Sequence, residues 1–213
     1  MKMILIENSS PTNEQFVRYQ EAYNYFNRKL FNGELSPCLL NFSRLKGALG
    51  FFAYKRWLNN ESGDYTHEIS LNPDLLPRPM DEIMAVLVHE MAHQWQFDCG
   101  KPSGRGYHNK QWTGKMESIG LVPSSTGQPG GKKTGYRMAH YIPKDGRFAK
   151  VFSEMPQDFL LPWTGIPLTT SRGNAKPRQD KLKYSCPKCL TNVWGKHDLN
   201  IFCGNCLSKY RTN

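Results

Sequence analysis

The sequence lacks a long hydrophobic run. No window of its 213 residues approaches the roughly 18 consecutive apolar residues that a membrane-spanning helix needs, which argues against a membrane protein. The apolar stretch at residues 3–6 is too short for the core of a secretory signal, and Glu7 and further polar residues follow it at once. We therefore expect a cytoplasmic protein.

Acidic residues are scarce in the C-terminal half. Residues 99–213 hold 19 Lys or Arg against 6 Asp or Glu, whereas residues 1–98 hold 9 against 12, so that net charges of +13 and −3 make up the total of +10. This asymmetry predicts a polyanionic partner for the C-terminal half, with general solubility as the alternative explanation. A disordered chain is not expected, because 38% of the residues are hydrophobic and 12% are aromatic.

Cysteines are few, and four of the six form two C-x-x-C pairs, Cys186 with Cys189 and Cys203 with Cys206. Thirteen residues separate the pairs, which allows a hairpin to return and four thiolates to surround one zinc ion without leaving an open position. In a reducing compartment this favours a structural zinc ribbon over disulfides or a redox dithiol. A module of residues 183–213 has too small a core to fold without its metal.

The strongest motif is H-E-x-x-H at His89, Glu90 and His93. Apolar residues from Ile83 onward recur at helical spacing, and Gly100 provides a stop, so the motif is expected on a helix. Histidines four apart lie on one helix face and can present two imidazoles to one ion, with the glutamate beside them as a base. Taken alone, the pattern also fits two histidines and a glutamate on a solvated helix face.

A catalytic zinc usually has three protein ligands and one open position, so a third ligand is expected downstream. The candidate is His108, fifteen residues after His93. Gly104 and Gly106 allow the chain to turn back over the helix, and residues 109–119 can form a second helix that carries Trp112.

These motifs together resemble the Spartan-related SprT-like metallopeptidase family. The resemblance rests on residues 89–95 (HEMAHQW), on the glycine-flanked His108 followed by Trp112, and on the four-cysteine ribbon. Residues 26–35 (FNRKLFNGEL) and 68–73 (EISLNP) are also similar to that family. The likeness covers residues 12–120 and, by cysteine spacing only, residues 183–211, while segment 121–180 departs from it.

The resemblance implies a zinc-dependent peptidase of minimal zincin-like fold. In this family His89, His93 and His108 would hold the catalytic zinc, and Glu90 would be the general base. It further implies that the substrates are proteins bound or crosslinked to DNA, and that DNA contact brings the enzyme to them. An edge strand would hold the substrate in extended form by backbone pairing.

An α+β fold is expected, with an N-terminal helix, a small sheet and the H-E-x-x-H helix followed by the ribbon. Thr12 and Asn13 can cap the first helix, which ends near residue 31. Strands are expected at residues 37–45, 49–57, 67–72 and 136–143, with a further element at 147–152 and a linker at 169–181. The predicted domains are a metallopeptidase core at 1–120, a Gly/Pro-rich basic connecting segment with short strands at 121–182, and the four-cysteine zinc ribbon at 183–213.

The remaining histidines and cysteines have no assigned chemistry. His67 starts a strand and is expected to be exposed, His140 lies either near the cleft or within a sheet, and His197 falls between ribbon cysteines whose site is already complete. None of the three is expected to bind metal. Cys38 and Cys99 are predicted to be small buried residues.

The ribbon carries basic residues interleaved with aromatic ones, which suits contact with nucleic-acid backbone and bases. A protein-binding ribbon is the alternative. The candidate nucleic-acid contacts are Lys181, Lys183, Lys188, Lys196, Lys209 and Arg211, with Tyr184, Trp194, Phe202 and Tyr210 among them.

The sequence therefore predicts a peptidase with one catalytic and one structural zinc, acting on proteins bound to DNA. The DNA is expected to be single-stranded or recognised without strong sequence preference, and a bacterial protein of this kind would associate with the nucleoid. The alternative is a nucleic-acid-binding or regulatory zinc protein with little or no peptidase activity. A third hypothesis is a peptidase with one dedicated partner, docked through the ribbon.

Overall fold

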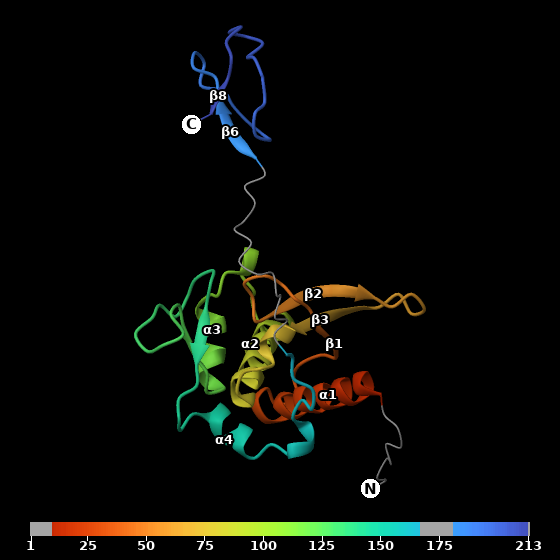
Figure 1. Cartoon of the computed structure of the whole chain (residues 1–213). Helices are drawn as coiled ribbons and strands as arrows, with labels where there is room; N and C mark the ends of the chain where they lie inside the picture. The colour runs from red at the N-terminus through yellow and green to blue at the C-terminus, as the bar shows by residue number, and fades with distance from the viewer. Residues whose placement is uncertain (1–9, 167–180, 213) are drawn as a thin grey trace. The chain divides into compact units, whose positions relative to one another are not determined.

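The computed structural model describes residues 10–166 and 181–212, which fall into two compact units divided after residue 167 (Figure 1). The expected linker at 169–181 lies outside the described residues except for residue 181. The apolar stretch at 3–6 lies wholly outside them. Within the described residues, no helix is both long and apolar enough to cross a membrane. The α+β fold is confirmed, and its helices and strands are, in order, α1 (Pro11–Leu30), β1 (Cys38–Phe42), β2 (Gly50–Leu58), β3 (Tyr65–Leu71), α2 (Met80–Cys99), α3 (Lys110–Ser118), β4 (Val122–Ser124), β5 (Ala139–Tyr141), α4 (Arg147–Ser153), β6 (Leu182–Ser185), β7 (Asn192–Gly195) and β8 (Arg211–Thr212).

The N-cap of helix α1 lies two residues before Thr12, the first of the two expected caps. Ser10 is the N-cap, because its hydroxyl accepts a hydrogen bond from the Asn13 backbone N–H at 3.3 Å, and Pro11 occupies the first turn, where its missing N–H costs nothing. The helix ends before Asn32 and Gly33, which both have positive φ. Its apolar stripe is buried in the core through Tyr19, Ala22, Tyr23, Phe26 and Leu30.

Strands β1, β3 and β2 form a three-stranded sheet in that order, with β1 parallel and β2 antiparallel to β3. Strand β2 is therefore an edge strand of this sheet. Its register with β3 shifts between Ala53 and Trp57, and Lys55 within this bulge has a φ of 44°. The bulge interrupts the pairing between Ala53 and Trp57, and pairing with β3 resumes at Trp57 and Leu58.

Helix α2 lies in the middle of the first unit, between the sheet and α3 (Figure 1). Asp81 and Glu82 place negative charge in its first turn, and Gly100 is its C-cap, as the sequence predicts. The helix is buried on nearly all sides, so its motif residues sit on a rigid element. Its fully buried apolar side chains are Ile83, Met84, Ala85, Leu87, Val88, Met91 and Ala92.

Residues 121–166 contribute to the core of the first unit. Phe148 of α4 is fully buried, and its ring stacks on Phe26 with centroids 5.8 Å apart. The Tyr25 hydroxyl donates a hydrogen bond to the Val151 carbonyl at 2.8 Å. Farther along, the Trp163 backbone N–H donates to the side chain of Gln15 at 3.0 Å. These contacts attach the segment to α1 along much of its length.

The second unit contains a three-stranded antiparallel sheet in the order β7-β6-β8. Among its described residues only Tyr184, Cys186 and Cys203 are buried. A core of this size agrees with a fold that depends on its cysteine cluster.

Candidate functional site

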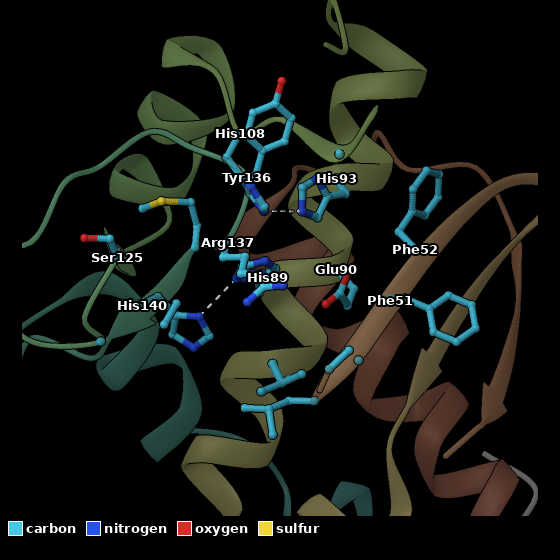
Figure 2. Close-up of a pocket in the computed structure, with 18 of the residues that line it drawn as sticks. Phe51, Phe52, His89, Glu90, His93, His108, Ser125, Tyr136, Arg137 and His140 are labelled. Carbon is cyan, nitrogen blue, oxygen red and sulfur yellow. Dashed lines mark hydrogen bonds between the residues drawn. The ribbon is translucent and has the colours of Figure 1, made fainter. Parts of the chain in front are cut away.

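Three histidines converge in the first unit. His89 and His93 lie one turn apart on α2, and His108 approaches from the loop before α3 (Figure 2). One candidate ligand atom from each lies within 4.8 Å of the other two. The Nε2 atoms of His93 and His108 are 3.0 Å apart, so both lone pairs can be directed at a shared cation.

His108 is held by the backbone of Gly135. The Gly135 carbonyl lies 2.8 Å from the His108 backbone N and 2.9 Å from its ring Nδ1, while the Gly135 N–H donates to the His108 carbonyl at 3.2 Å. A carbonyl oxygen can only accept, so Nδ1 carries the proton and Nε2 keeps a free lone pair. This is the tautomer that a metal ligand needs at Nε2.

Trp112 supports the histidine cluster from α3. Its side chain is fully buried, and its ring centroid lies 4.3 Å from that of His108 and 5.2 Å from that of His93, with the His93 ring nearly parallel to it. Asn109 caps α3 by accepting from the Trp112 backbone N–H at 3.0 Å. The local helix cap therefore fixes the residue against which the imidazoles pack.

Burial keeps the histidines of the cluster neutral. Desolvation lowers the pKa of His93 to about 3, and that of His89 falls well below its usual value through burial and the neighbouring histidines. The pKa of His108 is also lowered by burial. Neutral imidazoles with free lone pairs suit a divalent cation, so the three residues fit zinc.

Glu90 lies beside the cluster, buried between α2 and β2. Burial raises the pKa of its carboxyl to about 8 in the metal-free protein, and a hydrogen bond from the Phe52 backbone acts in the opposite direction. Gly50 allows β2 to approach this closely, since a Cβ there would lie 3.3 Å from the Glu90 Cγ and 3.1 Å from a Val86 methyl group. The carboxyl group therefore sits at the junction of the motif helix and the edge strand.

The site opens into a cleft of about 1470 Å³. Small-molecule pockets usually measure roughly 300–1,000 Å³, so this cleft is large enough for a segment of polypeptide. One wall is formed by residues 50–54 of β2, and the other by residues 125–128 and 136–142. The motif residues His89, Glu90, His93 and His108 line it between these walls.

Comparison with known proteins agrees with this geometry. Residues 19–131, more than half of the chain, match the model of the SprT-like family. The chain belongs to the SprT-like family. It is also similar to an "Uncharacterized protein in mucB 3'region" of Salmonella typhimurium, with 44% identity over 59 residues that span 28% of this chain and 80% of that protein.

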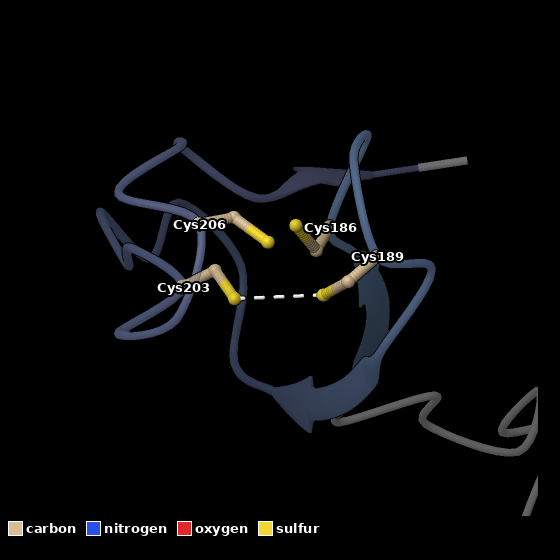
Figure 3. A group of neighbouring side chains, drawn as sticks. All are labelled: Cys186, Cys189, Cys203 and Cys206. Atoms are coloured by element: carbon tan, nitrogen blue, oxygen red, sulfur yellow. Dashed lines mark hydrogen bonds between the residues drawn. The ribbon is translucent and has the colours of Figure 1, made fainter.

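The second metal cluster of this SprT-like chain lies in the ribbon. Its four cysteines, Cys186, Cys189, Cys203 and Cys206, form a group with sulfur atoms close enough to share one ion (Figure 3). The arrangement agrees with the zinc ribbon that the spacing predicts.

Both halves of the ribbon fold in the same way. The Cys186 carbonyl accepts from the Leu190 backbone N–H at 3.0 Å, and the Cys203 carbonyl accepts from that of Leu207 at 2.8 Å. Leu190 and Leu207 both have positive φ. Hydrogen bonds from the Cys189 backbone and the Ser208 hydroxyl lower the pKa of Cys186 to about 6, which favours the thiolate. Two matching knuckles therefore present the sulfur atoms to one another.

The structure corrects two expectations about isolated residues. His67 is buried rather than exposed: its Nδ1 accepts from the Lys55 backbone N–H at 2.9 Å, and its Nε2 lies 3.1 Å from an Asp98 carboxylate oxygen. Cys99 is exposed rather than buried, because it is the last residue of α2, while Cys38 is partly buried. His67 thus connects the bulge of β2 to the C-terminal end of the motif helix.

The sequence assigned no role to two residues near the cluster. Gly135 holds His108, and His140 of β5 lies with its Nδ1 3.1 Å from the Nδ1 of His89. Burial lowers the pKa of His140 to about 4. No ligand spacing connects either residue to the H-E-x-x-H motif, although a position near the cleft was one of the two alternatives that the sequence left open for His140.

The six candidate nucleic-acid contacts, Lys181, Lys183, Lys188, Lys196, Lys209 and Arg211, are all exposed on the ribbon. Trp194 and Phe202 are also exposed, at 63% and 61%. Tyr184 differs from expectation, because it is buried and its hydroxyl donates to the Lys196 carbonyl at 2.6 Å. Tyr184 therefore supports the ribbon and cannot stack on a base.

Proposed function

We propose that the chain is a zinc-dependent peptidase that cleaves proteins bound or crosslinked to DNA. The observation that carries the proposal is the convergence of His89, His93 and His108 beside Glu90 in a cleft of polypeptide size. Zinc bound to the three imidazoles supplies a Lewis acid that activates water and polarises a carbonyl group.

Glu90 has the position of a general base. Its carboxylate takes a proton from water and gives it to the leaving amine, which requires the ionised form at the start of the reaction. A cation on the adjacent histidines favours that form, because opposite charge nearby lowers the pKa of a carboxyl group. The hydrogen bond from the Phe52 backbone acts in the same direction.

Strand β2 is suited to hold the substrate. It pairs with β3 on one side, and within the described residues no further strand of that sheet pairs with its other side. An extended peptide could add there by backbone hydrogen bonds, with its chain running past Glu90. Main-chain pairing makes little use of side chains, so the peptidase would accept varied sequences.

One face of the ribbon sheet supports contact with DNA. Lys183 pairs with Trp194 across β6 and β7, and Ser185 pairs with Arg211 across β6 and β8. Paired residues share a face, and Lys183 and Ser185 lie two positions apart on β6, so Lys183, Arg211 and the exposed indole of Trp194 lie on one face of the sheet. Such a face suits phosphates and a stacked base without reading sequence. A dedicated protein partner docked on this face is the competing outcome.

Cleavage of a DNA-bound protein tests the proposal, with and without single-stranded DNA. The wild type should bind two zinc ions and cleave, whereas Glu90→Gln should keep both ions and lose roughly 10²- to 10⁴-fold in rate. His108→Ala should keep one zinc and no activity. His197→Ala, at an exposed histidine of the ribbon, is the matched control and should cleave normally.

A nucleic-acid-binding protein with little or no peptidase activity is the second candidate, favoured by the exposed cations of the ribbon. DNA binding that falls steeply with salt, combined with no cleavage by the wild type under any condition, would support it against the peptidase. Cleavage that requires a single protein partner and ignores DNA would instead favour the ribbon as a docking element.

A further inference from the structure

A short segment outside the region matched by the SprT-like family contacts two of the three histidines. The family match ends at residue 131, and residues 135–141 follow it. Gly135 at the start of this segment hydrogen-bonds to His108, and His140 near its end lies against His89. Both segment residues therefore contact a candidate ligand at its ring Nδ1.

The geometry defines how His140 and His89 interact. Their Nδ1 atoms are 3.1 Å apart, with ring centroids separated by 5.2 Å (Figure 2). Two neutral imidazoles at this distance need one Nδ1–H donor and one Nδ1 acceptor. If His89 donates, its Nε2 keeps a lone pair for the cation, as the Gly135 carbonyl ensures for His108.

His140 does not belong to the ligand cluster itself. Among the described residues, the group of mutually close candidate ligand atoms in the first unit contains His89, His93 and His108 only. His140 is held separately, because β5 pairs with β4 and places it opposite Pro123. It thus approaches His89 from an element that carries none of the three candidate ligands.

We propose that His140 is a positioning residue whose Nδ1 accepts a hydrogen bond from the His89 Nδ1–H and so directs the His89 Nε2 toward the metal. Histidine ligands generally donate their second ring N–H to a carboxylate, a carbonyl or water, and loss of that partner costs roughly 10- to 100-fold in metal affinity or activity. Here a neutral imidazole takes that role, which fixes the ring without adding negative charge. The proposal rests on the metal site of the proposed function but not on proteolysis.

Two substitutions separate positioning from packing. An Asn side chain can place an acceptor near the former Nδ1, whereas a Gln side chain reaches toward the former Nε2 instead. His140→Gln should weaken metal binding at the histidine cluster by roughly 10- to 100-fold, and His140→Asn should recover most of the loss. His197→Gln makes the same change at an exposed ribbon histidine and should leave the affinity unchanged.

Cobalt(II) is a suitable probe in the full chain, because thiolate and imidazole sites have distinct absorption bands. The ribbon then serves as an internal reference, and its affinity should stay constant in every variant. At saturating cobalt the histidine-site spectrum of His140→Gln should match the wild type, since the ligands themselves are unchanged. A melting curve of each metal-free variant checks its fold. If His140→Gln fails to fold, His140→Ala takes its place.

Three results would overturn the proposal. The first is a cobalt affinity of the histidine site in His140→Gln that equals that of the wild type, and the second is an equal loss of this affinity in the Asn and Gln variants. The third is an altered histidine-site spectrum of His140→Gln at saturating cobalt, which would make His140 a ligand. The measurement needs no cleavage. A wild type without peptidase activity would therefore refute the proposed function and leave this test standing.

Discussion

Phe148→Ala tests whether residues 121–166 are part of the folded core rather than a connecting segment. Phe148 is fully buried in α4, stacks on Phe26 of α1 and lies 6.1 Å from the ring of Phe152. If the segment packs as the structure describes, truncation leaves a cavity between α1 and α4. If the segment were a loose connection, the same change would have almost no effect.

The size of the effect follows from the area lost. A buried phenylalanine removes roughly 150–250 Å² from water, and at about 25 cal/mol per Å² complete burial is worth roughly 4–6 kcal/mol. Alanine retains part of this area, and measured Phe→Ala costs in cores are about 3–5 kcal/mol. In a domain of this size each kcal/mol lowers Tm by roughly 2–4 °C, so a decrease of about 6–20 °C is expected.

Thermal and urea unfolding of the first unit, followed by circular dichroism, measures the decrease in Tm and in the free energy of unfolding. Phe202→Ala is the matched control: the residue is 61% exposed in the ribbon, and its loss should change the free energy of unfolding by less than about 0.5 kcal/mol. A Phe148→Ala cost below about 1 kcal/mol would refute the packing of α4 on α1.

Two further predictions concern the backbone of the first unit and the ribbon. Gly120→Ala should destabilise the first unit by more than about 1–2 kcal/mol in chemical denaturation, because the φ of Gly120 is +91° and a Cβ there would meet the backbone nitrogens of Phe148 and Arg147. Gly114→Ala in α3 is the matched control. A Cβ at Gly114 meets no other atom, so this change should stabilise the first unit by about 0.5–1 kcal/mol. Cys186→Ser should lower the zinc content from two ions per chain to one and make the ribbon sensitive to limited proteolysis. The melting temperature of the first unit should not change. An unchanged zinc content would contradict the shared cysteine site.

Local patterns predicted the parts of the molecule whose chemistry is local. The motif helix was recognised because its apolar period, its charged first turn and Gly100 all lie within a few turns of His89. The ribbon cysteines were recognised because a metal knuckle needs its two thiolates three positions apart. His108 required only one assumption, that a catalytic zinc has a third protein ligand.

What the sequence missed depends on pairs that are far apart in the chain. His67 is buried because Asp98 and the Lys55 bulge come to it from other elements, and nothing near residue 67 indicates this. The same holds for His140, whose contact with His89 spans 51 positions. The glycines, prolines and lysines of residues 121–166 indicated a connecting segment, and the contacts of its few aromatic residues with α1 likewise join positions far apart in the chain.

The two candidate metal sites differ in how much of their structure depends on a bound ion. The histidine cluster lies on a buried helix and against the fully buried Trp112, so its geometry exists before any ion binds. The ribbon has few buried side chains and no comparable core within its described residues, so its metal must supply much of its folding energy. In the first unit the histidine site would therefore release an ion without unfolding. In the ribbon, loss of an ion would disrupt the surface that carries Lys183 and Trp194, so the proposed DNA contact there would depend on that ion.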